Sequence, residues 1–96
     1  MIDLDNYGEQ TAKDLCLNVA ARERQQRKAR KLSRQALADK SGVTVASLRR
    51  FEETGEISFH SLVLLLKTLG DTSALDKFFT QPNFQSIQEV IDAKRY

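Results

Sequence analysis

The stretch 34–51 has the residue spacing of two short helices that cross through a tight turn. Counting from its first residue, a small side chain stands at the fifth position (Ala38), glycine at the ninth (Gly42) and apolar residues at the fifteenth and eighteenth (Leu48 and Phe51). A methyl group leaves room where one backbone crosses another, and glycine adopts positive φ in a turn without steric cost. The segment therefore predicts two helices at a steep angle.

Apolar residues of this stretch recur at helical spacing, and we predict that they form its buried face: Leu37, Val43, Leu48 and Phe51. The alternative is an ordinary pair of amphipathic helices with a glycine between them. Because several steric constraints agree within a short segment, we favour a helix-turn-helix, in which the second helix docks in DNA.

Positive charge is concentrated in the same part of the chain. Residues 22–50 hold ten Lys and Arg against two acids, a local charge of +8, whereas the rest of the chain carries −6 and the whole chain only +2. Such a basic block is the electrostatic footprint of a surface that binds a polyanion. A solvated helix face is the alternative for a charge run alone, but the adjacent helix-turn-helix spacing favours phosphate contacts.

Several functional classes are not supported by the composition. Ninety-six residues make one domain with a modest core. The sequence has no apolar stretch that would span a bilayer, no N-terminal leader, no metal-ligand cluster and no nucleophile–base pair, so we expect no membrane partner, metal, cofactor or enzymatic activity. The single Cys16 suits a reducing cytoplasm, and we expect it to be a small core residue rather than a redox group. His60 is expected to pack or to lie on the surface.

The fold class is predicted to be all-α, with five or six helices. We divide the chain into an N-terminal arm (1–10), a helix-turn-helix domain (11–80) and a C-terminal helical tail (81–96). Hydroxyl caps and glycines predict four helices, at about 12–31, 34–41, 45–54 and 59–69. A short fifth helix would begin at 71–73 and end at Phe78-Phe79, and a capping box at 86–89 would open a last helix. The apolar side of the first helix would be formed by Leu15, Val19, Ala20 and Ala29.

The helix at 59–69 is apolar almost all round, so it must be covered on several sides. Val63 and Leu64 are apolar residues outside the main leucine stripe of this helix. We expect them to be covered by a partner. We therefore predict a homodimer whose contact lies in residues 59–96. The alternative is that the last helix folds back and completes a monomeric core.

A set of short motifs supports this interpretation: Leu32-Ser33, Leu37-Ala38, Gly42-Val43-Thr44, a helix-terminal Glu52, and the leucine-rich run from Leu62 to Leu69. Together they resemble the Xre (Cro-repressor) family of bacterial and phage helix-turn-helix regulators. The resemblance implies a five- or six-helix lambda-repressor-like DNA-binding domain. The run 49–58 is similar to the HipB-like antitoxins, small regulators encoded beside HipA-like kinases.

The resemblance implies DNA contacts of two kinds. Four residues of the recognition helix would read bases: Val45, Ala46, Arg49 and Arg50. Val45 and Ala46 cannot hydrogen-bond a base edge but can pack on a thymine methyl, so hydrogen-bonded reading falls on the two arginines, with guanine O6 and N7 as acceptors. Seven residues would contact phosphates: Arg27, Lys31, Ser33, Arg34, Gln35, Thr44 and Ser47.

Two further expectations concern residues near this surface. Where the family usually has glutamine, this chain has Arg34, which keeps the reach to phosphate but loses the bridge of an amide to the recognition helix. Glu52 would repel phosphate if it faced DNA, so we expect it to hold its helix against a neighbouring basic residue instead.

The predicted function is a homodimeric transcriptional repressor that binds a double-stranded DNA operator. The alternative is a HipB-like antitoxin subunit that binds a HipA-type kinase toxin and autoregulates its operon, with Phe78, Phe79 and Phe84 on the binding surface. RNA binding is the weaker option, because the basic block has no interleaved aromatics on which bases could stack.

Overall fold

The computed structural model describes residues 10–80. The chain there forms four α-helices and one turn of 3-10 helix, without strands: α2 (Ala12–Ala29), α3 (Arg34–Ser41), α4 (Val45–Thr54), α5 (Phe59–Leu69) and η1 (Leu75–Lys77). An all-helical domain is confirmed for this part of the chain. The C-terminal tail with its expected last helix, and all but the final residue of the N-terminal arm, lie outside the described residues.

Each of the four α-helices begins at a hydroxyl side chain, as the sequence predicted. These hydroxyls accept a hydrogen bond from the backbone N–H three residues further on, at 3.0–3.1 Å: Thr11, Ser33, Thr44 and Ser58. The bounds of α3, α4 and α5 agree with the predicted ranges. The first helix ends earlier than expected, because Lys31 has φ +57 and the Leu32 N–H turns back to the carbonyl of Arg27.

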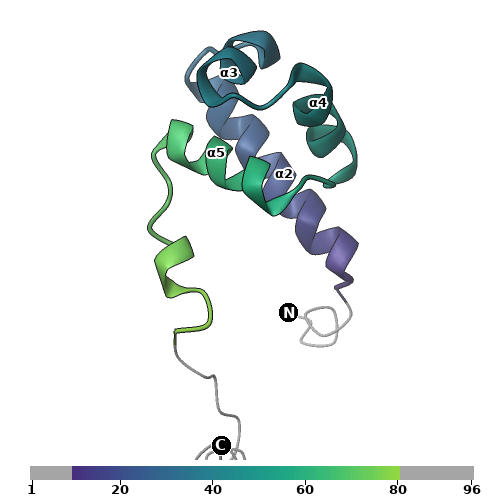
Figure 1. Cartoon of the computed structure of the whole chain (residues 1–96). Coiled ribbons are helices and arrows are strands. Elements are labelled where there is room, and N and C mark those ends of the chain that lie inside the picture. The colour runs from purple at the N-terminus through teal and green to yellow at the C-terminus, as the bar shows by residue number, and fades with distance from the viewer. Residues whose placement is uncertain (1–9, 81–96) are drawn as a thin grey trace, which may run out of the picture.

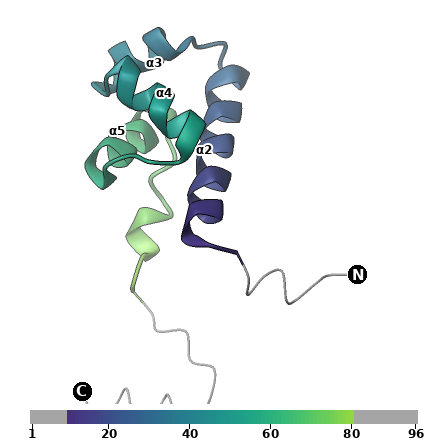
Figure 2. The same ribbon diagram turned by 90° about the vertical axis from the view of Figure 1, so that its right-hand side faces the viewer.

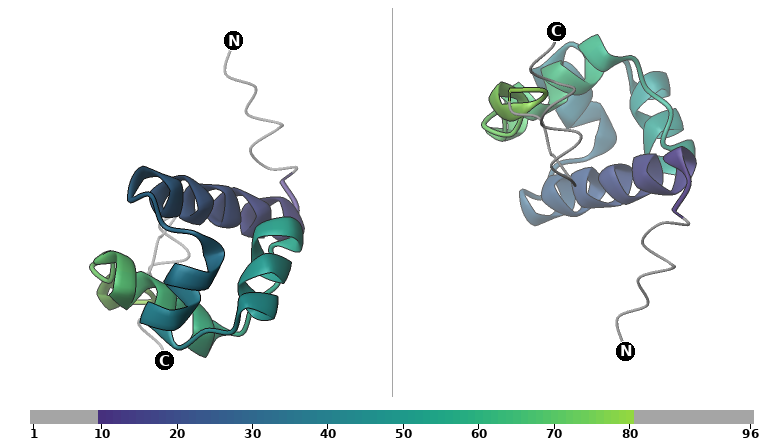
Figure 3. Two further views of the ribbon diagram at one scale, coloured as in Figure 1. Left: turned by 90° about the horizontal axis from the view of Figure 1, so that it is seen from above. Right: turned by 90° about the horizontal axis from the view of Figure 1, so that it is seen from below.

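The helices surround one small core. Helix α2 runs along one side of the domain, and α3, α4 and α5 gather on the other (Figures 1 and 2). Seen from above, α2 and α4 form adjacent sides of a frame whose remaining sides are α3 and α5 (Figure 3). All four predicted inward residues of the helix-turn-helix are buried in this core, together with Ala20, Leu65 and Leu69.

Two glycines at helix ends have different surroundings. Gly42, between α3 and α4, has φ +82, and a Cβ placed there would meet nothing within 4 Å. Gly55, at the end of α4, has φ +79, and a Cβ there would lie 3.0 Å from the backbone of Cys16 and Leu17. The first glycine is needed for the turn alone, whereas the second also allows α4 to approach the backbone of α2.

The structure corrects the predicted buried face of the first helix. The buried residues of α2 are Ala20, Glu23 and Arg27, while Leu15 and Val19 keep 51% and 38% of their surface exposed. Cys16, expected in the core, is exposed. Ala20 is the one residue of the predicted stripe that reaches the core, and Arg27 is buried on the same side because it pairs with Glu52 of α4.

The expected fifth helix is also corrected. Only the single 3-10 turn of η1 forms, and it lies away from the body formed by the other helices (Figures 1 and 2). So short a segment is not stable as an α-helix unless an apolar face packs on the core, and η1 has no buried residue. The helical conformation ends at Phe78, whose backbone is extended, and Phe79 after it adopts φ +61.

Candidate nucleic-acid interface

Helix α4 has one buried and one exposed side. Leu48 and Phe51 are almost completely buried and fix the helix to the core. Ala46, Arg49 and Arg50 are exposed, and Val45 is half-buried. Three of the four predicted base-reading residues are therefore accessible from solvent, and the fourth is accessible in part.

Arg50 is held by an acid in the turn that follows its own helix. Its Nε donates to Oε2 of Glu56 at 3.0 Å, and its Nη2 donates to the same oxygen. The hydrogen bonds from Arg50 lower the pKa of Glu56. Both side chains are largely exposed, at 68% and 64%, so water and ions compete with this pair. Arg50 is therefore oriented but remains free to exchange partners.

Polar groups gather at the N-termini of α3 and α4. Ser33 and Thr44 cap these helices and are exposed, and Thr44 Oγ1 also donates to Ser47 Oγ at 2.9 Å. Gln35 is exposed on the first turn of α3, where its amide donates to Asp39. Lys31 is exposed in the connection between α2 and α3. Free amides and hydroxyls at helix N-termini suit phosphate oxygens, so the predicted contacts other than the two arginines lie in accessible positions.

The two remaining predicted phosphate residues belong to a buried charge cluster. Arg27 donates through Nε and Nη2 to both oxygens of Glu52, at 2.8 and 2.9 Å, and through Nη1 to the carbonyl of Leu32 at 2.9 Å. The hydrogen bond to Glu52 raises the pKa of Arg27, whose side chain is only 9% exposed. This geometry argues against a phosphate contact by Arg27, because all three guanidinium nitrogens are already engaged.

Arg34 lies at the edge of the same cluster. Its Nε donates to Oε1 of Glu52 at 3.0 Å, while its side chain keeps 30% of its surface exposed. We expected that arginine at this position would lose the bridge to the predicted recognition helix. This expectation is wrong, because Arg34 bridges to Glu52 of α4. The structure bears out the expectation that Glu52 holds its helix against basic residues, and it shows two such partners.

The exposed end of α4 borders a shallow cleft of about 370 Å³ at the start of α5. Ser47, Arg50 and Glu56 line it from the α4 side, and Ser58 and Ser61 from the α5 side. This places the hydroxyls of a third helix N-terminus beside the predicted base-reading arginine. Ser58 also caps α5, and its position beside Arg50 could not be predicted from the sequence.

A family model described as Helix-turn-helix matches residues 24–76, more than half of the chain. The chain belongs to the helix-turn-helix family. Members are DNA-binding regulators, generally without enzymatic activity. Comparison with curated proteins gives no significant match. The match spans α3 and α4, and the exposed arginines Arg49 and Arg50 lie on α4.

The residue that sequence reasoning missed in this helix-turn-helix protein is Glu23. It is buried, and neither of its carboxylate oxygens has a hydrogen-bond partner among the described residues. Burial, reinforced by the nearby carboxyl of Glu52, raises its pKa to about 8. Two ionised carboxylates cannot hydrogen-bond each other, but a protonated Glu23 can donate to Glu52.

Glu52 responds in the opposite direction. Burial by itself raises its pKa, but the hydrogen bonds from Arg27 and Arg34, together with the neighbouring carboxyl of Glu23, outweigh this effect and hold the pKa at about 2. The cluster therefore shares one negative charge between two arginines at neutral pH. The only sequence signal for this arrangement was the four-residue spacing of Glu23 and Arg27, which places them on one helix face.

Within residues 10–80, no group of three or more potential ligands is placed to hold a metal ion. None of the helices described there is long and apolar enough to cross a bilayer.

Proposed function

We propose that this protein is a sequence-specific repressor that inserts α4 into the major groove of an operator. The observation that carries the proposal is the exposed face of α4, on which Arg49 and Arg50 project from a helix anchored by buried residues. An arginine can donate two hydrogen bonds to guanine O6 and N7, which distinguishes guanine from the other bases. Ala46 and the accessible part of Val45 would contact thymine methyl groups.

Phosphate contacts would supply most of the affinity. We assign them to the side chains that the structure leaves accessible beside α4: Lys31, Ser33, Arg34, Gln35, Thr44 and Ser47. Arg27 is assigned a positioning role instead, because its buried ion pair with Glu52 joins α2 to α4. Contacts of this kind fix the orientation of a protein on DNA without reading the sequence.

We further propose that the repressor is a homodimer in the cytoplasm. One module of this size covers too little DNA for tight operator binding, whereas two-fold symmetry places two recognition helices in successive major grooves about 34 Å apart. The large exposed apolar side chains near the expected contact are Phe59, Phe78 and Phe79. Light scattering at micromolar concentration should give the mass of a dimer. A protein that stays monomeric even on operator DNA would contradict the symmetric arrangement.

Arg50→Ala tests the base-reading role. The operator is first identified by sequencing the native DNA that the protein retains, and binding is then measured on operator and on random DNA. We expect a loss of about 1–3 kcal/mol on the operator and almost no change on random DNA. The matched control is Lys67→Ala, which removes one positive charge from an exposed position on α5. Equal losses on both DNAs for Arg50→Ala would show that this side chain does not read bases.

The second candidate function is that of an antitoxin subunit. Two observations support it: the resemblance of the run 49–58 to HipB-like regulators, and the exposed Phe78 and Phe79, whose rings meet edge to face with centroids 6.5 Å apart. Exposed aromatic pairs of this kind anchor protein contacts. If a kinase-like protein is encoded next to this gene, the two purified proteins should form a stable complex that Phe79→Ser weakens. If the two purified proteins do not associate, the antitoxin proposal is wrong.

A further inference from the structure

Positive side chains line the flank of α2 that faces α4. Arg24 and Lys28 lie four residues apart on one face of the helix, about 6 Å from each other along its axis, and both are exposed. A cleft of about 440 Å³ opens between the two helices there, and it is lined by Glu52 from α4 and by five residues of α2: Leu17, Ala21, Arg24, Gln25 and Lys28. The α2 wall is therefore basic toward the C-terminus of the helix, where α3 follows.

These two charges have no acidic partner in the described part of the chain. Glu52 is the one acid that lines the cleft, and its two carboxylate oxygens already accept hydrogen bonds from Arg27 and Arg34. The ion pairs among residues 10–80 use Arg27, Arg34 and Arg50 as their bases. A cleft with two such cations attracts an anion from solution.

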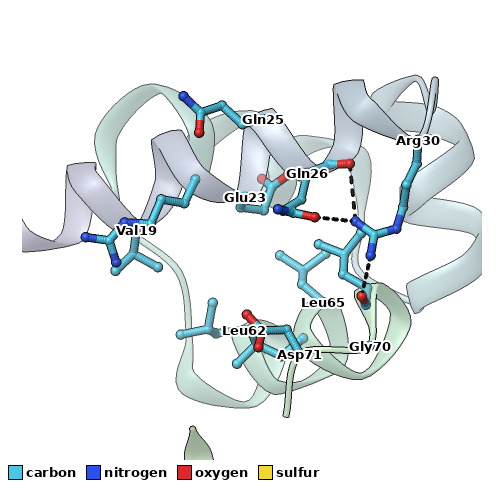
Figure 4. Close-up of a pocket in the computed structure, with 12 residues that line it drawn as sticks. Val19, Glu23, Gln25, Gln26, Arg30, Leu62, Leu65, Gly70 and Asp71 are labelled. Carbon is cyan, nitrogen blue, oxygen red and sulfur yellow. Dashed lines mark hydrogen bonds between the residues drawn. The ribbon is translucent and has the colours of Figure 1, made fainter. Parts of the chain in front are cut away.

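The other flank of α2 faces α5, and its charge is used differently. Arg30 donates to the side chain of Gln26 at 2.7 Å and to the carbonyl of Leu69 at 2.6 Å, so it ties the end of α2 to the end of α5 (Figure 4). Asp71 adds a carboxyl to the groove on this side. The α5 flank therefore attracts an anion less strongly than the α4 flank does.

The cleft adjoins the phosphate contacts proposed for the start of α3. The backbone N–H of Lys31 donates to the carbonyl of Lys28 at 2.9 Å, and Arg34 donates to the Glu52 carboxylate beside the cleft. Helices α2 and α4 are adjacent sides of the frame seen in Figure 3, while α5 lies below α3 and α4 in Figure 1. Basic side chains therefore follow one another from the middle of α2 to the start of α3: Arg24, Lys28, Lys31 and Arg34.

We propose that Arg24 and Lys28 bind phosphates of the DNA backbone beside the major groove that α4 enters. This inference rests on the proposed function, since the DNA backbone is the anion that would lie next to α4. Each strand carries one phosphate per about 3.4 Å of helix axis, so a series of cations can contact several phosphates of one strand. Such contacts add affinity and fix orientation without reading the sequence. Helix α2 then takes part in binding as well as in the fold.

The salt dependence of DNA binding tests the two contacts. Arg24→Gln and Lys28→Gln should each weaken binding to operator and random DNA alike and lower the slope of log affinity against log salt by roughly 0.9. The loss of affinity between about 50 and 200 mM salt should then be roughly threefold smaller for each variant than for the native protein. Circular dichroism confirms that the variants are folded.

The matched control is Arg22→Gln. It removes the same charge two residues before Arg24, from an exposed side chain that lines the groove on the α5 side. Its slope should equal that of the native protein. Slopes that fall equally for all three variants would assign the effect to net charge and overturn the proposal.

Affinity cleavage gives an independent measurement of which flank lies against DNA. In a full-length Cys16→Ser background, an iron–EDTA group is attached to Ala21→Cys in the cleft or to Val19→Cys on the α5 side. We expect the first protein to cut the operator at least fivefold more than the second, because the radicals act close to where they form. Equal cutting, or stronger cutting from Val19→Cys, would contradict the proposal.

The failure of this inference can be distinguished from the failure of the proposed function. If the native protein binds DNA and its salt slope is unchanged in Arg24→Gln and Lys28→Gln, only the contacts of α2 are wrong. If the native protein binds no DNA even at low salt, the proposed function and this inference are both wrong.

Discussion

Two arginine–glutamate pairs involve α4, and they differ chiefly in burial. Glu52 pairs with Arg27 where the side chains are 0% and 9% exposed, whereas Arg50 pairs with Glu56 where they are 68% and 64% exposed. The buried pair is surrounded by low dielectric and is satisfied by several hydrogen bonds, so breaking it leaves an uncompensated charge. The exposed pair exchanges easily with water and salt. The first pair therefore fixes where α4 lies, and the second leaves an arginine available to a ligand.

The largest effect is expected from removing the acid of the buried pair. Glu52→Ala leaves Arg27 and Arg34 without their carboxylate, which for a buried pair costs on the order of 3–5 kcal/mol. We expect about 3 kcal/mol, because Glu23 can ionise and take over part of the pairing. Urea unfolding followed by circular dichroism gives the free energy of unfolding. The control is Glu53→Ala, which removes an exposed acid at the next position. If both variants lower the free energy of unfolding equally, burial does not distinguish the pairs.

The second carboxyl of the cluster predicts an unusual pH dependence. Glu23 has a pKa of about 8 in the folded protein and an ordinary value of 4.5 when unfolded. Below pH 4.5 both states carry the proton, and between pH 4.5 and 8 only the unfolded state releases it. The free energy of unfolding should therefore fall as pH rises through this range, by at most about 1.4 kcal/mol per pH unit. Glu52, with its lowered pKa, acts oppositely and stabilises the fold as pH rises from about 2 to 4.5.

Glu23→Gln isolates this contribution. The amide keeps the shape of the side chain and can donate to Glu52, but it does not titrate. We expect the fall between pH 5 and 8 to disappear, so that the variant is roughly 2–3 kcal/mol more stable than the native protein at pH 8. Urea unfolding at several pH values provides the measurement. Parallel pH profiles of the two proteins would show that Glu23 does not remain protonated in the folded state.

The third prediction compares three basic residues by their burial. Lys31→Gln and Arg34→Gln should each weaken binding to all DNA sequences and reduce the slope of log affinity against log salt by roughly one unit. Arg27→Gln should leave the slope unchanged in the fraction of protein that is folded, because its charge is neutralised inside the protein. Fluorescence anisotropy over a salt series separates these outcomes. A slope that falls for Arg27→Gln and for neither of the others would reverse our assignment of structural and DNA-facing charges.

The local part of this fold could be predicted from sequence, and the burial of charges could not. The caps Ser33 and Thr44 and the turn at Gly42 specify α3 and α4 almost to the residue, because the signals lie within one turn of the structure they determine. Glu23 lies in a run of basic residues and resembles a solvated acid. Its burial depends on the docking of α4 against α2, a contact that is remote in sequence and has no local signal.

The same reasoning explains the other differences. The apolar stripe of α2 indicated a core face, yet Leu15 and Val19 remain exposed because the described helices leave one side of α2 uncovered. Arg50 was predicted to be exposed and to read bases, but its pairing with Glu56 was not predicted, since the turn at Gly55 determines how close that acid comes. Spacing predicts which residues share a helix face, whereas the partner of that face depends on how the helices pack.

The smallest expected effect concerns the exposed pair. Because Arg50 must leave Glu56 before it can contact a base, Glu56→Gln should strengthen operator binding, by roughly two- to fivefold at low salt and less as salt rises. The free energy of unfolding should hardly change, since both side chains are in water.

The same substitution in an Arg50→Ala background distinguishes this mechanism from general repulsion between Glu56 and phosphates. If Glu56 acts by holding Arg50, the gain is lost when the arginine is absent, and the two substitutions are non-additive. If the gain is the same in both backgrounds, Glu56 only repels the DNA backbone and does not restrain the arginine. Anisotropy titrations of the four proteins on operator DNA complete the cycle. A non-additive result would show that the exposed pair, unlike the buried one, acts on binding and not on the stability of the fold.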